Sequence, residues 1–244
     1  MADILLQALG KRLQFARFFH KEGTKPFLEI MRQIEKGEEP YVDTRDPEST
    51  DDEPAFYSEW EDADVARDLA GMACLSVIQG ALQSYISEYL NDFFGKVDKD
   101  GRDFFARNQK VFKDAFGIEW QDSSADLALI REMILVRNDS QHNTSILRSI
   151  FTASRKTERQ FPKPRFRHKG WIHLVAIRLV VYEENIEQAI AAVEGLSGYL
   201  SSLRSELRTR LRAGYELPDG FEHRSKLSFL DKAGDLDDWG EEAS

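Results

Sequence analysis

The stretch Glu183–Arg212, EENIEQAIAAVEGLSGYLSSLRSELRTRLR, decides the fold. Its apolar side chains recur at alternating steps of three and four residues, the spacing that places them on one face of an α-helix. A face of this length is typical of helix–helix packing, either within the chain or across a dimer. The sequence therefore predicts a long C-terminal helix and a mainly α-helical bundle. The residues of this face are Ile186, Ala189, Val193, Leu196, Leu200, Leu203 and Leu207.

The N-terminal part of the chain shows the same helical spacing. Residues 3–20 have the pattern of an amphipathic helix, which Gly23 is expected to end. Pro26 is suited to the first position of a helix, so a second, short helix is predicted from there through Ile34.

Three further helices are predicted before the C-terminal one. They cover residues 58–94, 102–116 and 125–138. Gly71 and Gly80 lie inside the first of them, where a residue without a side chain allows another element to approach closely.

The segment before the last helix has a different character. Residues 171–182 are rich in β-branched side chains and are apolar on both faces. They are compatible with a strand that pairs with residues 161–168 in a small β-hairpin, and a helix is the competing prediction.

The composition is that of a globular protein with an acidic balance. Of the 244 residues 41% are hydrophobic. The formal net charge is −10, which argues against a protein that coats nucleic acids non-specifically. The single Cys74 excludes an intrachain disulfide framework and a zinc site with several thiolates, and its apolar context predicts a buried thiol. Because the sequence shows neither a signal-peptide pattern nor a run of about 18 apolar residues, we expect a cytoplasmic protein without a membrane span.

Acidic side chains gather in two segments. Between Glu35 and Glu53 nine carboxylates oppose two basic side chains, prolines recur, and little is apolar. Residues 37–54 are therefore predicted to be a mobile acidic loop. An alternative is that this loop imitates a nucleic acid and covers a basic site. Residues 216–244 are predicted to be an acidic C-terminal tail.

The stretch ILVRNDSQHN, residues 134–143, carries the clearest chemistry. Arg137 ends an apolar helical run, Asn138 follows it, and His142 comes five residues after the arginine. Arginine stays charged and can clamp a phosphate through two parallel N–H bonds, and histidine can exchange a proton near neutral pH. Together they could cleave a phosphodiester without a metal. The alternative is an exposed arginine and a capping or surface histidine at a helix end.

This spacing of Arg137, Asn138 and His142 resembles the R-x4-6-H motif of the HEPN superfamily, the higher eukaryotes and prokaryotes nucleotide-binding domains. Its members are all-helical, and many are metal-independent endoribonucleases in which a polar residue, often asparagine, follows the arginine. Asn143 departs from the pattern, since some branches have glycine there. The resemblance covers the motif closely and the helical layout of about residues 55–210 loosely.

The position of the motif on its helix raises a geometric question. Arg137 follows Ile130 and Ile134 on the buried face, whereas His142 would lie about 140° around a continuous helix. Residues 138–140 are poor helix-interior residues, so we expect the backbone to bend or end there and bring the two side chains together. If they stay apart, a second subunit could complete the site.

Residues 145–170 are the most basic part of the chain. Eight basic side chains face one carboxylate, Glu158, which concentrates a charge of about +7 after the motif. Such a segment can bind a phosphate backbone through counterion release, and Phe161 and Phe166 could stack on unpaired bases. The alternative is a solvated loop that pairs with the acidic loop. The basic residues are Arg148, Arg155, Lys156, Arg159, Lys163, Arg165, Arg167 and Lys169.

The resemblance and the basic segment together suggest a single HEPN-like helical domain over residues 1–215 and a metal-independent endoribonuclease without a cofactor. By the resemblance, Arg137 would neutralise the pentavalent phosphate, Asn138 would orient it, and His142 would transfer protons while the ribose 2′-hydroxyl attacks. The expected partners are RNA, a second copy, and a cognate antitoxin or defence protein, because related nucleases act as toxins or in defence. The alternative is a non-catalytic helical module that binds RNA or a protein.

Overall fold

The protein is mainly helical, as the sequence predicts. The computed structural model describes residues 3–45, 53–94, 103–142, 151–168 and 177–213, and within these ranges it contains no strand. The elements are α1 (Ile4–Lys36), α2 (Tyr57–Asn91), α3 (Phe104–Phe116), the 3-10 helix η1 (Trp120–Asp122), α4 (Leu127–His142), α5 (Arg155–Gln160) and α6 (Glu183–Arg212).

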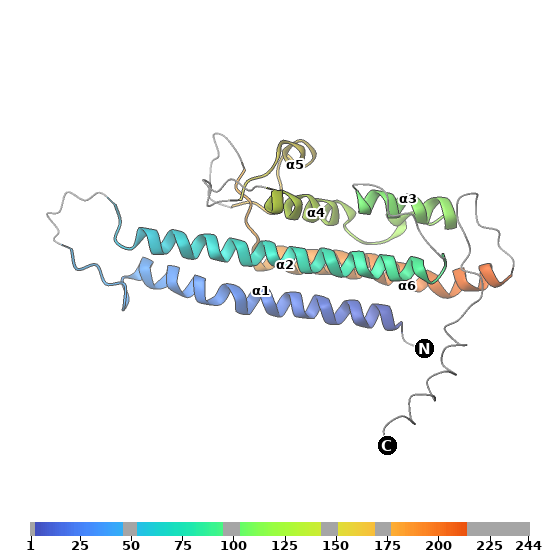
Figure 1. Ribbon diagram of the computed structural model, residues 1–244, viewed down its shortest axis with the longest axis horizontal. Coiled ribbons are helices and arrows are strands. Elements are labelled where there is room, and N and C mark those ends of the chain that lie inside the picture. Colours follow the sequence, from blue (N-terminus) through green and yellow to red (C-terminus); the bar gives the residue numbers. More distant parts are fainter. Residues whose placement is uncertain (1–2, 46–52, 95–102, 143–150, 169–176, 214–244) are drawn as a thin grey trace, which may run out of the picture.

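Three long helices make the body of the protein (Figure 1). α1 and α2 form an antiparallel hairpin, α6 runs alongside, and α3, α4 and α5 lie on the side of α2 away from α1. α2 is the central helix, because it contacts α1, α4 and α6. Its buried residues are spread around most of its circumference, which is the pattern of a helix enclosed by others.

The predicted C-terminal helix is confirmed with the same bounds, Glu183–Arg212. Its apolar face packs within the chain, against α1, α2 and α4. Six of the seven residues predicted for this face are buried, and Leu203 is partly buried against the same core. The core of the bundle therefore forms along α6, which supports the intramolecular alternative for this face.

The prediction that Gly23 ends the first helix is wrong. α1 continues through Gly23 and Pro26 to Lys36 as one helix of 33 residues. The hydroxyl of Thr24 donates to the carbonyl of His20 at 2.8 Å, and both side chains are buried. The buried stripe of α1 thus runs through the glycine and the proline without a break, so packing against α2 outweighs their poor helix propensity.

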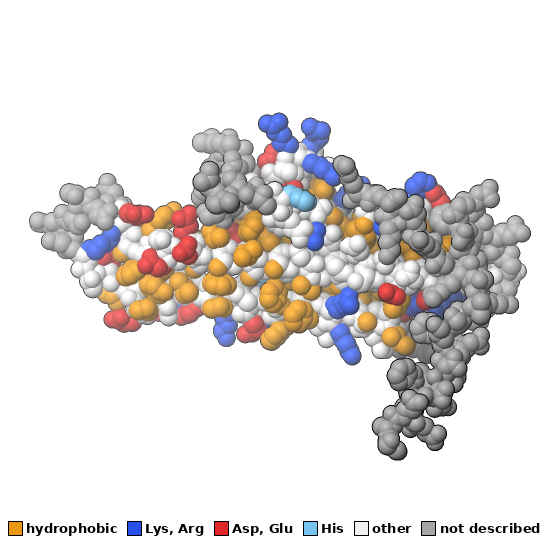
Figure 2. Space-filling model, in the orientation of Figure 1, with side chains coloured by type: hydrophobic (Ala, Val, Ile, Leu, Met, Phe, Trp, Pro, Cys, Tyr) orange, Lys and Arg blue, Asp and Glu red, His pale blue; other side chains and the backbone are white. Residues whose placement is uncertain are grey.

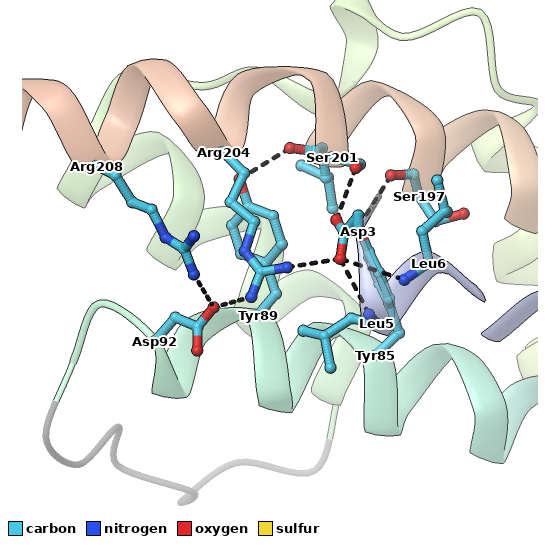
Figure 3. Close-up of polar contacts among 11 residues, drawn as sticks. Asp3, Leu5, Leu6, Tyr85, Tyr89, Asp92, Ser197, Ser201, Arg204 and Arg208 are labelled. Carbon is cyan, nitrogen blue, oxygen red and sulfur yellow. Dashed lines mark hydrogen bonds and ion pairs between the residues drawn. The ribbon is translucent and has the colours of Figure 1, made fainter. Parts of the chain in front are cut away.

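A polar cluster around Arg204 ties the N-terminus to α6 (Figure 3). Its guanidinium lies between the carboxylates of Asp3, at 2.6 Å, and Asp92, and sits 5.6 Å from the ring centroid of Tyr89. Ser201 donates to Asp3 at 2.7 Å. These contacts join the start of α1, the end of α2 and the last turns of α6 at one end of the bundle.

The predicted buried thiol is confirmed. Cys74 is fully buried in α2 and donates to the carbonyl of Ala16 at 3.1 Å, and burial raises the pKa of its thiol to about 12. α2 is also the one helix among the described residues that is long and apolar enough to cross a membrane by length and composition. More than half of its most apolar window, 56%, is buried inside the protein, as in the core helix of a bundle.

The segment before α6 pairs with its neighbours only at isolated points. Antiparallel bridges join Thr152 to Arg178 and Arg167 to Leu179. The second bridge connects the two segments expected to form a β-hairpin, but the described residues contain no strand, and residues 171–176 lie outside them. The β-hairpin is therefore not confirmed.

The described part of the predicted acidic loop has local contacts. Arg45 binds the carboxylate of Asp43 at 2.9 Å and donates to the carbonyl of Glu53 at 2.6 Å. The ring of Tyr41 meets that of Phe56 edge-on. Residues 46–52 lie outside the described residues, as does the predicted acidic tail, so their predicted mobility stays a prediction.

Gly71 is expected to contribute to the stability of the fold, because a Cβ there would lie 2.8 Å from the Cβ of Val181. We expect Gly71→Ala to lower the free energy of unfolding by about 1–3 kcal/mol through overpacking. Gly80 is the matched control in the same helix, since nothing lies within 4 Å of its Cβ position. Gly80→Ala should raise stability by about 0.5–1 kcal/mol through better helix propensity. Urea unfolding of both variants tests this, and equal effects would contradict the packing of Val181 on α2.

Candidate functional site

The helix that carries the motif is fixed on both sides. α4 packs against α2 and α6, and its residues Ile130, Met133 and Val136 are fully buried. At its start the carboxylate of Asp126 accepts the backbone N–H of Leu129 at 2.9 Å. A helix held in this way sets the direction of each side chain along it.

The prediction that the backbone bends after Arg137 is wrong. α4 stays helical through His142. The polar residues that were expected to interrupt it have found other partners: the hydroxyl of Ser140 donates to the carbonyl of Arg137 at 2.7 Å, and the carboxylate of Asp139 accepts the N–H of Ser154 at 2.8 Å. Because their hydrogen bonds are compatible with the helix, they do not unwind it.

Arg137 and Asn138 lie together at the edge of the core. Both side chains are half-buried, and Nη1 of Arg137 donates to Oδ1 of Asn138 at 3.1 Å. Within the described residues Arg137 forms no ion pair, and its buried Nε has no hydrogen-bond partner. A buried donor without a partner costs about 1–3 kcal/mol, and a bound water, ion or ligand would offset that cost.

His142 is not brought to this pair. Its side chain is exposed on the last turn of α4, about 140° around the helix from Arg137. It lies one turn beyond Asn138, four residues along the same side of the helix. The structure therefore unites two of the three motif residues and leaves the histidine at the surface.

Arg137 and Asn138 line a cleft of about 450 Å³ between α2, α3, α4 and α5. Three further cations line it, Arg107, Arg131 and Lys156, against one carboxylate, Asp103. Arg131 and Asp103 approach only to 3.9 Å, and both are half exposed. The cleft is therefore a positively charged concavity that can bind an anion, in a chain that is acidic as a whole.

The basic segment is anchored to α4 by carboxylates. Glu132 is buried and accepts backbone N–H groups of Arg165 and Phe166, and Asp126 binds the guanidinium of Arg165 at 2.6 Å. Burial raises the pKa of Glu132, an effect that its hydrogen bonds only partly offset. Together with the hydrogen bond that the Ser154 N–H donates to Asp139, these contacts place α5 at one wall of the cleft.

The residues predicted to bind RNA fall into three groups. Arg165 is engaged by Asp126, so it acts as an anchor, and Arg148 and Lys169 lie outside the described residues. The others are exposed and form no ion pair with a described residue, and the side chains on α5 gather on one face (Figure 2). This exposed group consists of Arg155, Lys156, Arg159, Lys163 and Arg167.

The two phenylalanines of the segment differ from the prediction. Phe166 is fully buried in the core, so it cannot stack on a base, and Phe161 is half-buried. Phe166 therefore anchors the loop to the core, and its charged neighbours stay outside. A side chain that enters the core without a polar partner has to be apolar, which explains the alternation.

Sequence reasoning missed Arg107, Arg131 and Gln79 as parts of the site. Arg131 had a local signal, because it lies seven residues before Asn138 and thus on the same side of α4. Arg107 on α3 and Gln79 on α2 had none, since only the packing of three helices brings them to the cleft.

Comparisons of the chain with family models, with curated proteins and with solved structures found no match. The likeness to the HEPN superfamily therefore rests on the motif at Arg137, Asn138 and His142.

Glu132 should give the protein a measurable pH dependence. Its pKa in the fold is raised above the ordinary value of 4.5, so the folded state holds this proton more tightly than the unfolded chain. Its contribution to stability is then largest below pH 4.5 and falls as the pH rises through the higher folded pKa. The side chain introduced by Glu132→Gln cannot ionise, so the stability of this variant relative to wild type should increase over that window, by at most about 1.4 kcal/mol per pH unit.

Urea unfolding from pH 4 to pH 8 measures this difference. The loss of one backbone hydrogen bond adds an offset that does not depend on pH. Glu206→Gln, on an exposed position of α6, is the control for removal of a carboxylate. A difference between Glu132→Gln and wild type that is flat with pH would contradict the burial of this carboxylate.

Proposed function

We propose that this protein is a metal-independent endoribonuclease of HEPN type whose active site forms between two copies of the chain. One observation carries the proposal: the half-buried guanidinium of Arg137, which forms no ion pair within the described residues and donates to Asn138, lines a cleft together with three other cations. A guanidinium held in this way suits a phosphate, because it donates in a planar fork and remains charged.

The reaction needs one anion site and two proton transfers. The ribose 2′-oxygen attacks the adjacent phosphorus, its proton leaves to a base, and the bond from phosphorus to the 5′-oxygen breaks as that oxygen takes a proton. The products are a 2′,3′-cyclic phosphate and a 5′-hydroxyl. Arg137 neutralises the charge that develops on the pentavalent phosphate, Asn138 orients it, and His142 exchanges the protons.

The need for a second copy follows from the continuous helix. Arg137 and His142 of one chain point about 140° apart. In a two-fold dimer the same surface meets itself, so Arg137 of one copy can meet the partner's His142, and two equivalent sites form. The exposed position of His142 at the end of α4 is compatible with this arrangement.

The biological role follows the resemblance: we propose a toxin or a defence effector that a cognate antitoxin or defence protein controls. A second candidate is a non-catalytic module that binds RNA in the same cleft. The exposure of His142 outside the cleft favours it, because that histidine could then be a surface residue at a helix end.

Cleavage of single-stranded RNA in EDTA tests the nuclease. Wild type should release cyclic-phosphate products and leave DNA of the same sequence intact, because DNA lacks the attacking hydroxyl. His142→Ala should slow cleavage about 10²–10⁴-fold, and Arg137→Ala should slow it at least about 10²-fold. Arg12→Ala, at an exposed position of α1, is the arginine control and should cleave like wild type. RNA that binds without being cut would favour the non-catalytic module.

Mixing two inactive variants tests the shared site. In a dimer of one Arg137→Ala chain and one His142→Ala chain, one of the two sites keeps both functional residues. Random exchange makes half of the dimers mixed, so about a quarter of wild-type activity should return. No recovery after exchange would mean that each chain builds its own site or that the pair is not catalytic.

A further inference from the structure

The cleft beside Arg137 is layered from floor to rim. Its floor is apolar and buried, formed by Phe105, Ile134 and Leu135. Its rim is exposed and polar, and it includes the cations Arg131 and Lys156. A phosphate alone would need only the rim, whereas the apolar floor suits a part of the ligand that is itself apolar.

One polar group is set into this floor. Gln79 is 7% exposed, and its Oε1 is buried without a hydrogen-bond partner in the described part of the chain. It lies on α2, the central helix, where an amide without a full set of partners is costly. Gln79 and Arg137 both line the cleft, so a small shift of the Gln79 side chain would turn its amide toward a ligand bound there.

We propose that this cleft is a pocket for one unpaired nucleotide, with the base on the floor against Gln79 and the phosphates on the cations above it. The buried amide would hydrogen-bond the edge of the base, and the apolar side chains would cover its face. Arg131 and Lys156 would hold the phosphates on either side of it. The volume of about 450 Å³ falls within the usual range of about 300–1,000 Å³ for small-ligand pockets.

The proposal restricts the substrate of the proposed nuclease to single strands. A base that is paired and stacked in a duplex cannot reach a buried floor, so the nucleotide has to be unpaired before it enters. The restriction on cleavage rests on the proposed nuclease function, whereas the binding of a nucleotide does not. The pocket itself can be tested with a strand that cannot be cut.

The first test uses the unaltered 244-residue chain. A short, labelled, single-stranded RNA with 2′-O-methyl riboses keeps its bases and phosphates but lacks the attacking hydroxyl. Its displacement is followed by fluorescence anisotropy with nucleoside 5′-monophosphates or ribose 5-phosphate as competitors. If the floor binds a base, at least one monophosphate should compete about tenfold better than the sugar phosphate, which has none. Equal competition by ribose 5-phosphate, or equally tight binding of a duplex, would overturn the pocket.

The second test separates the floor from the rim. Gln79→Leu keeps the approximate shape but removes the amide, so it should weaken binding about five- to tenfold and leave the salt dependence unchanged. Arg131→Ala with Lys156→Ala should lower the slope of log affinity against log salt by about 1.4, or about 0.7 for each phosphate that is no longer neutralised. The matched controls are Gln7→Leu and Lys11→Ala with Arg12→Ala, all at exposed positions of α1, and these should bind like wild type.

The outcomes distinguish this pocket from the nuclease. If Gln79→Leu binds the RNA as tightly as Gln7→Leu does while wild type cuts RNA in EDTA, the proposed nucleotide pocket is rejected and the proposed nuclease activity is retained. If the competition and the variants behave as expected but unmodified RNA stays intact, the proposed nuclease activity is rejected and the proposed nucleotide pocket is retained. Thermal unfolding of Gln79→Leu shows whether a loss of binding reflects a loss of fold, and the competition test with wild type decides the matter in that case.

Discussion

The continuity of α4 is the constraint on which the candidate site depends. Its buried residues Ile130, Met133 and Val136 pack between α2 and α6 and fix the rotation of the helix. With that rotation fixed, Arg137 and Asn138 leave the core at the edge of the cleft, and His142 emerges on the last turn. Because both side chains lie on one continuous helix, rotating α4 would move them together and keep the angle of about 140° between them. Their separation within one chain is therefore a consequence of a helix that stays unbroken through His142.

The second constraint is electrostatic and local. Glu132 and Asp139 lie on α4, Asp126 directly precedes it, and each binds a part of the basic segment. Their contacts are mostly with backbone N–H groups, so they position the segment without neutralising most of its side chains. Arg165 is the exception, and the cations of α5 remain exposed beside the cleft. A buried carboxylate is costly by itself, and the hydrogen bonds to Glu132 offset part of that cost while ordering the loop.

Much of the helical layout could be predicted from the sequence, because it depends on spacing within single segments. α6 and the extents of α2 and α3 follow from the recurrence of apolar residues, and the burial of Cys74 follows from its place in such a pattern. The errors fall where packing outweighs local preference. Gly23 and Pro26 favour a break, but the buried stripe of α1 crosses them.

The site was predictable only in part for the same reason. The motif drew attention to Arg137 and Asn138, which the structure places together, and the charge count drew attention to the segment that flanks them. The polar run after Arg137 led to the wrong prediction of a bend in the backbone, because Asp139 and Ser140 have hydrogen-bond partners that no local pattern reveals. Gln79 and Arg107 come from helices that are distant in sequence, so their contribution arises only from the tertiary fold.

An acidic protein can still present a binding site for a polyanion, because charge acts over short distances in salt. At physiological ionic strength the screening length is about 8 Å, so carboxylates elsewhere on the bundle weaken the field at the cleft only slightly. The cations around the cleft and on α5 then set the local potential. That potential would attract any phosphate chain, single or double, so it cannot select between them. In the proposed pocket, selection would come from the buried floor, because a base has to leave its stack before it can approach the amide and the apolar side chains there. If the proposal holds, attraction at the rim and discrimination at the floor are separate properties of one cleft, and substitutions would change either one without the other.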